Sequence, residues 1–281
     1  MTRGCDKTGA MSSPRNAPAP SGAAVRCVGV GRTYPAVGRS PAVLALDGID
    51  LVLMPGTITV LIGPSGCGKS TLLRLIAGID SSTTGWVRID DESAEAARRA
   101  KRFGFVPQAP TLLSWRSVRD NVRILTEVNN GGSSRTGRAT DAEIDGLLDA
   151  VGLRAFADAR PRTLSGGMAQ RVALARAFAL RADVLLLDEP FAALDELTRA
   201  EMRNLLCRLW REHATTVVFS THDLDEAVLL ADRIIVLSGR PGRIVADVAV
   251  GLERPSPEGL EETPAFLTAL ATVRAALRAA S

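Results

Sequence analysis

The chain has 281 residues, of which 46% are hydrophobic and 23% are charged, and its formal net charge is +3 at pH 7. A chain of this size and composition can form one large α/β domain or two small ones around a full apolar core. The small net charge does not suggest a clustered basic face, so it argues against a nucleic-acid-binding protein.

The cysteines and the hydropathy pattern narrow the class further. The cysteines are scattered, with no C-x-x-C pair, at Cys5, Cys27, Cys67 and Cys207. This spacing argues against a zinc site or a disulfide framework and is typical of a reducing compartment. No run of about 18 apolar residues occurs, so we expect no membrane-spanning helix.

The two ends of the chain differ in composition from its middle. Residues 1–24 are rich in proline, alanine, serine and glycine and lack the apolar segment of a secretory signal. We predict a disordered leader there, with either Met1 or Met11 as the start of translation. The main domain is expected over 25–250, and residues 251–281 predict a proline-broken linker followed by an amphipathic helix.

The first half of the main domain alternates strands with helices. Apolar and β-branched runs predict strands at 25–30, 43–54, 57–63 and 102–108. Helical spacing predicts helices at 71–78, 111–127 and 141–151, the last with Asp141 as its N-cap. A flexible loop is expected at 129–140. Because no strong strand follows residue 108 until well into the second half, we expect a helical subdomain at about 109–167.

The second half continues the alternation. It predicts strands at 184–188, 215–220 and 233–238 and helices at 168–180, 196–212 and 224–231. Strands that alternate with helices form a mainly parallel sheet covered by helices on both faces. The fold class is therefore α/β.

A phosphate-binding loop is predicted at 63–71, where GPSGCGKST fits the pattern G-x-x-x-x-G-K-[ST] between a strand and a helix. Its glycines let backbone N–H groups turn toward phosphate oxygens. The residues predicted to bind nucleotide here are Gly63, Pro64, Ser65, Gly66, Cys67, Gly68, Lys69, Ser70 and Thr71. Lys69 should bridge the β- and γ-phosphates, and Ser70 should hold Mg²⁺. The loop alone does not distinguish kinases, GTPases and motor ATPases.

A second glycine-rich segment, LSGGMAQR at 164–171, resembles the LSGGQ signature of ABC ATPases, although Met-Ala-Gln stands in place of the first Gln. Ser165, Gly166 and Gly167 open a predicted helix, whose N-terminus attracts anions. In that family two subunits pack head to tail, and the signature of each covers the ATP on the other's phosphate loop. The resemblance therefore implies a homodimer with two shared sites.

The strand VLLLDEP at 184–190 resembles the Walker B strand of the same family. Its apolar run ends in two carboxylates. The resemblance implies that Asp188 ligates Mg²⁺ through water and that Glu189 is the general base that polarises the attacking water.

Four single residues match further positions of the family. Gln108, in VPQ, corresponds to the Q-loop glutamine that touches Mg²⁺ and the water, and Asp195, in FAALD, to the D-loop aspartate at the dimer seam. His222, in STHD, corresponds to the switch histidine that hydrogen-bonds the γ-phosphate. Tyr34, the only tyrosine, lies where the family has an aromatic residue that stacks on adenine, with an edge-strand aromatic as the alternative.

The resemblance covers about 25–250, with all these motifs in family order. It implies a P-loop NTPase fold with a RecA-like parallel-sheet core, an N-terminal antiparallel β subdomain and a helical subdomain that carries the signature. It also implies ATP and Mg²⁺ as cofactors and Glu189, His222 and Lys69 as the catalytic residues.

Two segments are similar to the ATPases of nitrate, sulfonate and taurine importers: PTLLSWRSVRDNV at 110–122 and SGRPGRIV at 238–245. That resemblance implies a bacterial importer ATPase on the cytoplasmic face of the membrane. Its partners would be separate permease subunits, contacted at Trp115, and indirectly a solute-binding protein. A core or surface-packed tryptophan is the alternative for Trp115.

Other functions remain open at this point. An ABC exporter or a lipoprotein-release ATPase would share the catalytic motifs and differ around 109–125, and a regulatory module would bind nucleotide without turnover. A translation-associated ABC protein would carry two ATPase domains, and a DNA-repair ABC ATPase a long coiled coil, neither of which is present. Nitrate, a sulfonate, taurine and a thiamine precursor all remain possible solutes.

Overall fold

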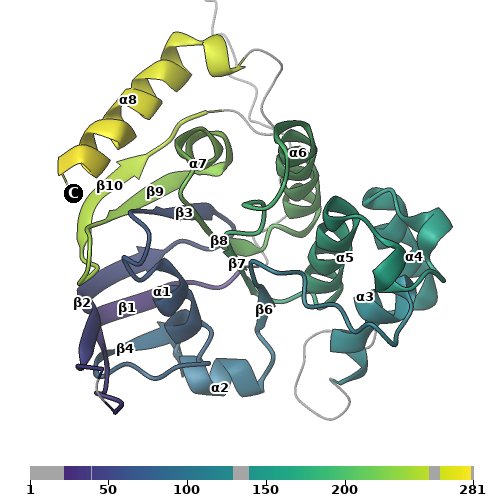
Figure 1. Ribbon diagram of the computed structural model, residues 1–281, viewed down its shortest axis with the longest axis horizontal. Helices are drawn as coiled ribbons and strands as arrows, with labels where there is room; N and C mark the ends of the chain where they lie inside the picture. Colours follow the sequence, from purple (N-terminus) through teal and green to yellow (C-terminus); the bar gives the residue numbers. More distant parts are fainter. Residues whose placement is uncertain (1–21, 39, 129–138, 253–259, 280–281) are drawn as a thin grey trace, which may run out of the picture.

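The computed structural model describes residues 22–38, 40–128, 139–252 and 260–279, and Figure 1 shows two sheets with helices around them. The larger sheet has the strand order β10-β9-β3-β8-β7-β6. Its strands are β3 (Ile58–Ile62), β6 (Phe103–Val106), β7 (Val184–Asp188), β8 (Thr216–Thr221), β9 (Arg233–Leu237) and β10 (Ile244–Ala249). All are parallel except β10, which pairs antiparallel with β9. The predicted parallel-sheet core is confirmed.

Successive residues of the central strands pack into two different cores, one on each face of the larger sheet. In β3, Val60 belongs to one core and Leu61 to the other. The first core includes residues of α5 (Gly166–Ala179), α6 (Glu196–His213), α7 (Leu224–Leu230) and α8 (Pro264–Ala279). The second core includes α1 (Lys69–Ile76) and the smaller sheet. Because both faces are covered, β3 and β7 are buried along their whole length, which explains their uninterrupted apolar sequences.

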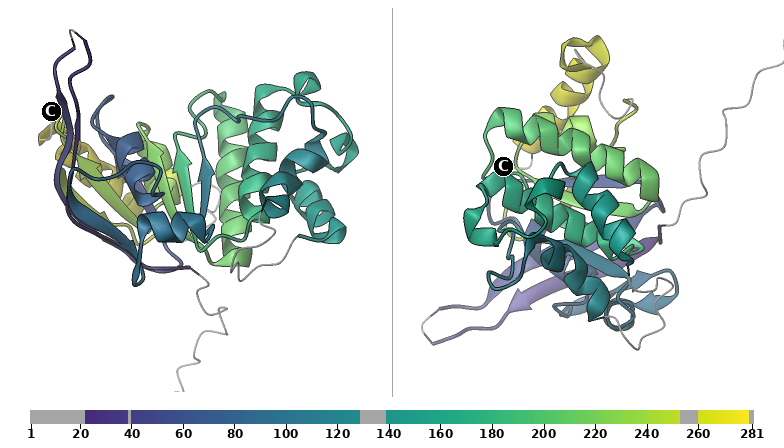
Figure 2. Two further views of the ribbon diagram at one scale, coloured as in Figure 1. Left: turned by 90° about the horizontal axis from the view of Figure 1, so that it is seen from below. Right: turned by 90° about the vertical axis from the view of Figure 1, so that its right-hand side faces the viewer.

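The smaller sheet is antiparallel, as expected for an N-terminal β subdomain, and it forms the long curved layer in the left view of Figure 2. In the order β2-β1-β4-β5 it contains β1 (Val25–Tyr34), β2 (Val43–Leu53), β4 (Thr84–Ile89) and β5 (Glu92–Ser93). The sequence pattern did not predict β4, β5 or the helix α2 (Ala94–Arg99). In β4 only Val87 and Ile89 are buried, so the alternation is too short to indicate a strand.

A helical region extends from the β6 side of the larger sheet, to the right in Figure 1. It contains α3 (Val118–Glu127), α4 (Asp141–Ala150), the 3₁₀ helices Arg154–Phe156 and Pro161–Thr163, and α5. The helix predicted over 111–127 begins only at Val118, because the Ser117 hydroxyl accepts the N–H of Asp120 and caps it there. The Asn121 side chain fixes the irregular segment before the cap, accepting the N–H of Leu113 at 2.7 Å.

The start of α4 differs from the prediction. Thr140, and not Asp141, is the N-cap: its hydroxyl accepts the N–H of Glu143, and the Glu143 carboxylate accepts the N–H of Thr140. This reciprocal pair is a capping box, which needs a hydroxyl three residues before a glutamate. Most of the loop predicted at 129–140 lies outside the described residues.

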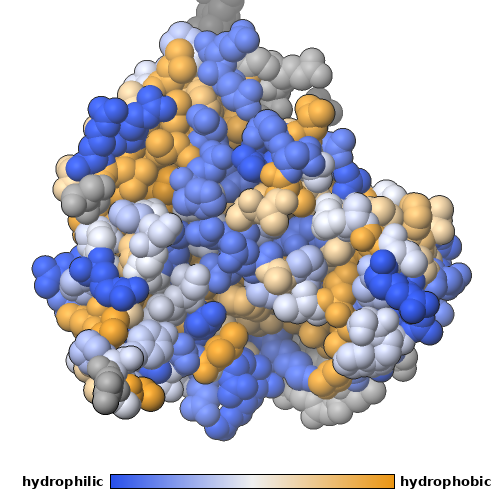
Figure 3. Space-filling view, viewed as in Figure 1, coloured by the Kyte–Doolittle hydropathy of each residue, from blue (hydrophilic) through white to orange (hydrophobic). Residues whose placement is uncertain are grey.

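The chain is packed three residues before the predicted boundary at Val25. Ala23 is buried, and its carbonyl accepts the Thr216 hydroxyl at 2.7 Å. Residues 22–24 are therefore part of the domain, while the rest of the predicted leader lies outside the described residues. At the other end α8 packs on α7, β9 and β10, and apolar surface follows it in Figure 3. No helix in the described ranges combines the length and apolar character needed to cross a bilayer.

Candidate nucleotide-binding site

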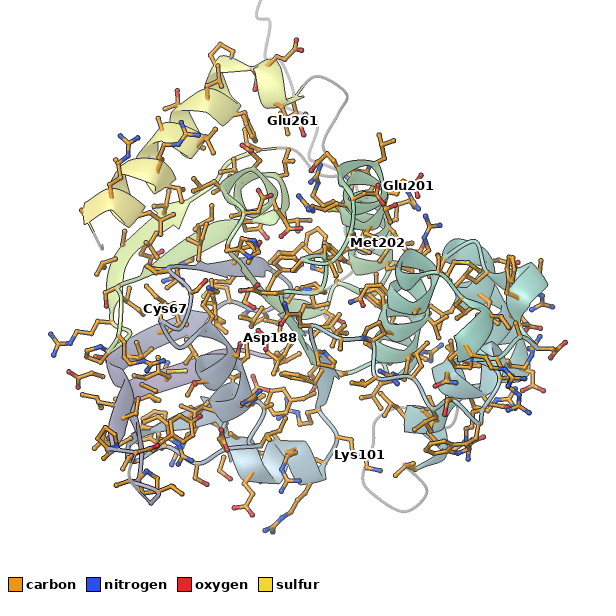
Figure 4. All side chains as sticks on the ribbon, in the orientation of Figure 1. Cys67, Lys101, Asp188, Glu201, Met202 and Glu261 are labelled. Atoms are coloured by element: carbon orange, nitrogen blue, oxygen red, sulfur yellow. The ribbon has the colours of Figure 1, made fainter. Side chains whose placement is uncertain are left out.

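The predicted site residues follow the carboxyl ends of neighbouring parallel strands. The phosphate loop joins β3 to α1, Asp188 ends β7, and Glu189 follows it. Gln108 comes after β6 and His222 after β8. Because these strands are adjacent and parallel, their ends meet at one edge of the sheet. Figure 4 labels Cys67 of the loop, in the left part of the view, and Asp188, nearer the middle of the molecule.

The phosphate loop depends on glycine at its turn. Gly66 and Gly68 have φ of 77° and 105°, a left-handed backbone that side chains disfavour. A Cβ at Gly68 would also lie 2.6 Å from the Leu46 side chain and 3.1 Å from the Ala45 carbonyl oxygen. The loop is therefore packed directly on β2, where a larger residue has no room.

Lys69 begins α1, and its side chain is only 5% exposed. Its Nζ donates to the carbonyl oxygens of Gly63 at 2.9 Å and Pro64 at 3.4 Å, and it lies 3.5 Å from Oε1 of Glu189. Gly63 and Pro64 thus hold the lysine, and neither lines the open cavity described below. The ammonium group is fixed inside the loop, where a phosphate would lie.

Asp188 accepts two hydroxyl groups on one carboxylate oxygen. The Ser70 hydroxyl donates to Oδ1 at 2.8 Å, and the Ser220 hydroxyl donates to the same atom at 2.9 Å. The predicted pair of Ser70 and Asp188 therefore meets across the sheet edge, although the two residues are 118 positions apart.

Glu189 has an unusual backbone and a fixed side chain. Its φ of 42° lies in the left-handed region, which is uncommon outside glycine and is often found at functional sites. The Glu189 N–H donates to both the carbonyl oxygen and the hydroxyl of Ser220, which stabilises this conformation. Its Oε2 lies 3.0 Å from Nδ1 of His222, whose side chain is 60% exposed. The carboxylate is thus held between His222 and Lys69.

These groups surround an open cavity of about 280 Å³. It is lined by Tyr34, Val43, Ala45, Ser65, Gly66, Cys67, Gly68, Lys69, Ser70, Thr71, Gln108, Asp188, Glu189 and Arg240. Most of the residues predicted to bind nucleotide and metal are therefore brought together. Tyr34 stands at the end formed by the smaller sheet, where its hydroxyl lies 3.4 Å from the Thr71 hydroxyl and donates to Asp80 at 3.3 Å.

A different part of the predicted site forms a second hollow on the helical side. It is lined by Ser165, Gly166 and Gly167 at the start of α5 and by Asp195 and Thr198 at the start of α6, among others. Ser165 caps α5 by accepting the N–H of Met168. Asp195 caps α6, and the backbone and side-chain hydrogen bonds that it accepts from Thr198 lower its pKa. None of these residues lines the loop cavity of the same chain.

Sequence reasoning missed two residues of the site: Ser220, which is buried behind the cavity residues Asp188 and Glu189, and Arg240, which lines the cavity. Ser220 contacts both Asp188 and Glu189, and its only signal was a polar residue near the end of a buried strand that precedes His222. Arg240 lines the cavity from the turn between β9 and β10. It lies within SGRPGRIV at 238–245, but the resemblance of that segment to importer ATPases did not assign the arginine to the nucleotide site.

The comparisons with known proteins agree with this geometry. The family model described as ABC transporter matches residues 46–192. The aliphatic sulfonates import ATP-binding protein SsuB 1 of Xanthomonas axonopodis pv. citri is 47% identical over 210 residues, which are 75% of this chain and 81% of that protein. The uncharacterized ABC transporter ATP-binding protein MJ0412 of Methanocaldococcus jannaschii is 45% identical over 76% of this chain and 78% of its own.

A solved structure extends the likeness to three dimensions. The ATP-binding cassette MJ0796, described as a dimer in a post-hydrolysis state bound to ADP and Pi, superposes with a TM-score of 0.70 at 32% identity, over 80% of this chain and 98% of its own. The expected resemblance to importer ATPases and the expected α/β P-loop fold are both confirmed. The chain therefore belongs to the ABC transporter family, as one of its ATP-binding, ATP-hydrolysing subunits.

Proposed function

We propose that this chain binds ATP in the loop cavity, hydrolyses it together with a second copy of itself, and thereby drives a bacterial importer of sulfonate-like solutes. The observation that carries the proposal is the position of the Glu189 carboxylate, 3.5 Å from Lys69 Nζ and 3.0 Å from His222 Nδ1. A carboxylate held beside the phosphate-binding lysine is in the right place to accept a proton from a water molecule that attacks the terminal phosphate.

The nucleotide would lie along the cavity from Tyr34 to Glu189. Tyr34 belongs to the smaller sheet and offers a ring for the adenine, while Glu189 follows β7 at the far side of the loop. Between them the loop provides backbone N–H groups and Lys69 for the phosphates. A Lys69 ammonium that already lies inside the loop needs little reorganisation when phosphate oxygens take the place of the Gly63 and Pro64 carbonyls.

The oxygen atoms around Asp188 fit a magnesium ion. The Ser70 hydroxyl and the Asp188 carboxylate lie 2.8 Å apart, and Gln108 lines the same cavity. Hydroxyl, carboxylate and amide oxygens are the hard ligands that Mg²⁺ takes beside nucleotide phosphates. When bound, Mg²⁺ would neutralise charge on the β- and γ-phosphates. Ser220 keeps the Asp188 carboxylate turned toward Ser70.

The hydrolytic step then uses groups already in position. Glu189 accepts the proton of the attacking water, and His222 holds the carboxylate and can donate to the γ-phosphate. Lys69 stabilises the charge that develops on the phosphate oxygens. The left-handed backbone at Glu189, fixed by Ser220, aims the side chain at these partners.

A second copy would complete the site. Ser165, Gly166, Gly167 and Asp195 line a hollow that shares no residue with the loop cavity, so one chain cannot bring the two together around one nucleotide. Gly166 has open space around its Cβ position, which leaves the start of α5 accessible to a phosphate. A head-to-tail pair would place this hollow over the partner's loop. The description of MJ0796 as a dimer supports pairing of two copies.

Coupling to a permease would occur on the helical region. Trp115 is 70% exposed in the irregular segment before α3, and its carbonyl oxygen accepts an Arg160 N–H. Phe156, 43% exposed, also belongs to this region. A large aromatic residue on a fixed backbone is a typical anchor for a partner protein. We place the subunit on the cytoplasmic face of the cell membrane, where it would be held by permease subunits. A solute-binding protein would deliver the solute to those permease subunits.

The proposed class of solute is based on the names of similar proteins. Proteins 44–47% identical to this chain are named as import ATP-binding proteins for aliphatic sulfonates, which favours import over export and a sulfonate over the other solutes. The ATPase does not contact the solute, so these names support a class and not a single compound.

The proposal is tested by steady-state ATP hydrolysis of the wild type and Glu189→Gln, with Glu212→Gln, an exposed residue of α6, as the matched control. Because a general base contributes roughly a hundredfold or more, turnover should fall by at least about that factor in Glu189→Gln while ATP binding persists. Glu212→Gln should hydrolyse like the wild type. Equal turnover by Glu189→Gln and the wild type would exclude Glu189 as the base.

A further inference from the structure

The turn between β9 and β10 contributes one residue, Arg240, to the lining of the loop cavity. β9 is parallel to β3 and adjacent to it, so the segment after β9 leaves the sheet beside the phosphate loop. This turn carries the sequence SGRPGRIV at 238–245, to which neither hydrolysis nor permease docking gives a role.

The backbone of the turn is fixed on two sides. The Gly242 N–H donates to the Ala45 carbonyl oxygen at 2.9 Å, and the Asp47 N–H donates to the Gly242 carbonyl oxygen at 3.1 Å, so the turn pairs with β2. A Cβ at Gly242 would collide with the carbonyl oxygen of Cys67 in the phosphate loop. The Ser238 hydroxyl closes the turn by accepting the N–H of Arg243 at 2.9 Å. The side chain at position 240 therefore starts from a well-defined place against the loop.

The turn contains two arginines, Arg240 and Arg243, and their side chains have different partners. Arg243 Nε donates to the Asp47 carboxylate at 3.0 Å and does not line the cavity. Arg240 lines the cavity, and its Nη2 donates to the Gly66 carbonyl oxygen at 3.4 Å. Among the described residues Arg240 makes no ion pair with a carboxylate. Its guanidinium thus keeps most of its five donors for another acceptor in the cavity.

Arg240 lies on the opposite side of the phosphate loop from the hydrolytic carboxylate. In the order β10-β9-β3-β8-β7-β6, Arg240 follows β9 on one side of β3, whereas Glu189 follows β7 on the other. Val43 and Ala45 of β2 also line the cavity: Ala45 accepts the N–H of Gly242 in the turn, and Val43 pairs with Tyr34. The guanidinium therefore faces the part of the cavity that leads toward Tyr34.

We propose that Arg240 binds the α- and β-phosphates of the nucleotide, as a second cation beside Lys69. The inference rests on the proposed nucleotide site. A guanidinium is always charged and matches two phosphate oxygens at once, so it suits a diphosphate better than a single point charge does. Because it lies away from Glu189, Arg240 strengthens binding of ADP and ATP alike and takes no part in hydrolysis of the terminal phosphate.

The test compares Arg240→Gln and Arg240→Lys with the wild type, with Arg208→Gln, an exposed arginine of α6, as the control for loss of one charge. Isothermal titration would measure Kd for ADP and for ATP in EDTA, where hydrolysis does not occur. We expect Arg240→Gln to raise both Kd values by a similar factor, on the order of five- to tenfold, and Arg240→Lys by less. Arg208→Gln should bind both nucleotides like the wild type.

Two results would overturn the role of Arg240: unchanged affinity for ADP in Arg240→Gln, or weakened binding of ATP alone, which would indicate a γ-phosphate or dimer contact. Lys69→Ala, which should lose nucleotide binding altogether, separates this inference from the site itself. If Lys69→Ala loses binding and Arg240→Gln does not, only the inference about Arg240 fails. If the wild type binds neither nucleotide, the proposed site fails and the inference with it.

Discussion

At the scale of single residues, Glu189 is held from three directions, one through its backbone and two through its carboxylate. Ser220 holds its backbone, His222 holds one carboxylate oxygen, and Lys69 lies near the other. Ser220 also donates to Asp188, so one hydroxyl positions both the residue assigned to the metal and the residue assigned to the water. Positioning of this kind costs no reorganisation when the substrate binds.

Glu226 in α7 gives a prediction about pH. Its side chain is 3% exposed, and Oε1 has no hydrogen-bond partner among the described residues. Burial raises its pKa to about 7, with Asp223 adding to the shift and Thr221, Arg203 and Arg199 opposing it. Because the folded state holds the proton more tightly than the unfolded state does, the favourable contribution is complete below about pH 4.5 and is lost as the pH rises through about 7.

We therefore expect the free energy of unfolding of the wild type to fall more between pH 5 and pH 8 than that of Glu226→Gln, which cannot lose a proton. The difference should be on the order of 2–3 kcal/mol. Urea denaturation of both proteins across this range measures it. Parallel curves for the two proteins would show that Glu226 does not titrate there.

At the scale of helices and strands, side-chain caps decide where helices begin. Ser117 starts α3 seven residues later than the helical spacing of 111–127 suggests, and Thr140 starts α4 in place of the predicted cap Asp141. Both hydroxyls accept a backbone N–H of the first turn. Periodicity alone does not locate such ends, because irregular segments also carry apolar residues.

Thr140→Ala tests the capping box of α4. The substitution removes the hydroxyl that accepts the Glu143 N–H, and it should lower the free energy of unfolding by about 1 kcal/mol. Asp141→Ala is the matched control: its side chain is 79% exposed and pairs with Arg123, so its loss should cost clearly less. Chemical denaturation would decide between them, and a larger loss for Asp141→Ala would restore the original assignment of the cap.

The strands with uniformly buried residues could be predicted from the sequence, whereas β4, β5 and β10, which are very short or largely exposed on one face, could not. β3 and β7 are buried throughout, and their apolar runs were sufficient. β10 alternates half-buried and exposed residues at the edge of the larger sheet, and β5 has only two residues, so neither gave a usable pattern. In the site, motifs identified the residues along the chain, but Arg240 depended on β9 lying next to β3, which no local pattern contains.

At the scale of the whole molecule, the residues assigned to one nucleotide are divided between two hollows. The loop cavity lies at the edge of the larger sheet, and the hollow with Ser165 and Asp195 lies where α5 and α6 begin. Each chain thus carries two different halves of a site. Two chains related by a twofold axis would combine these halves into two identical sites.

Mixing two defective chains tests this division most directly. Lys69→Ala damages only the loop half, and Ser165→Arg damages only the signature half, so each protein alone should be inactive. In a mixed dimer the intact loop of one chain meets the intact signature of the other, and an equimolar mixture should recover about a quarter of wild-type ATP hydrolysis if dimers form at random. A mixture no more active than its separate components would contradict a site shared between two copies.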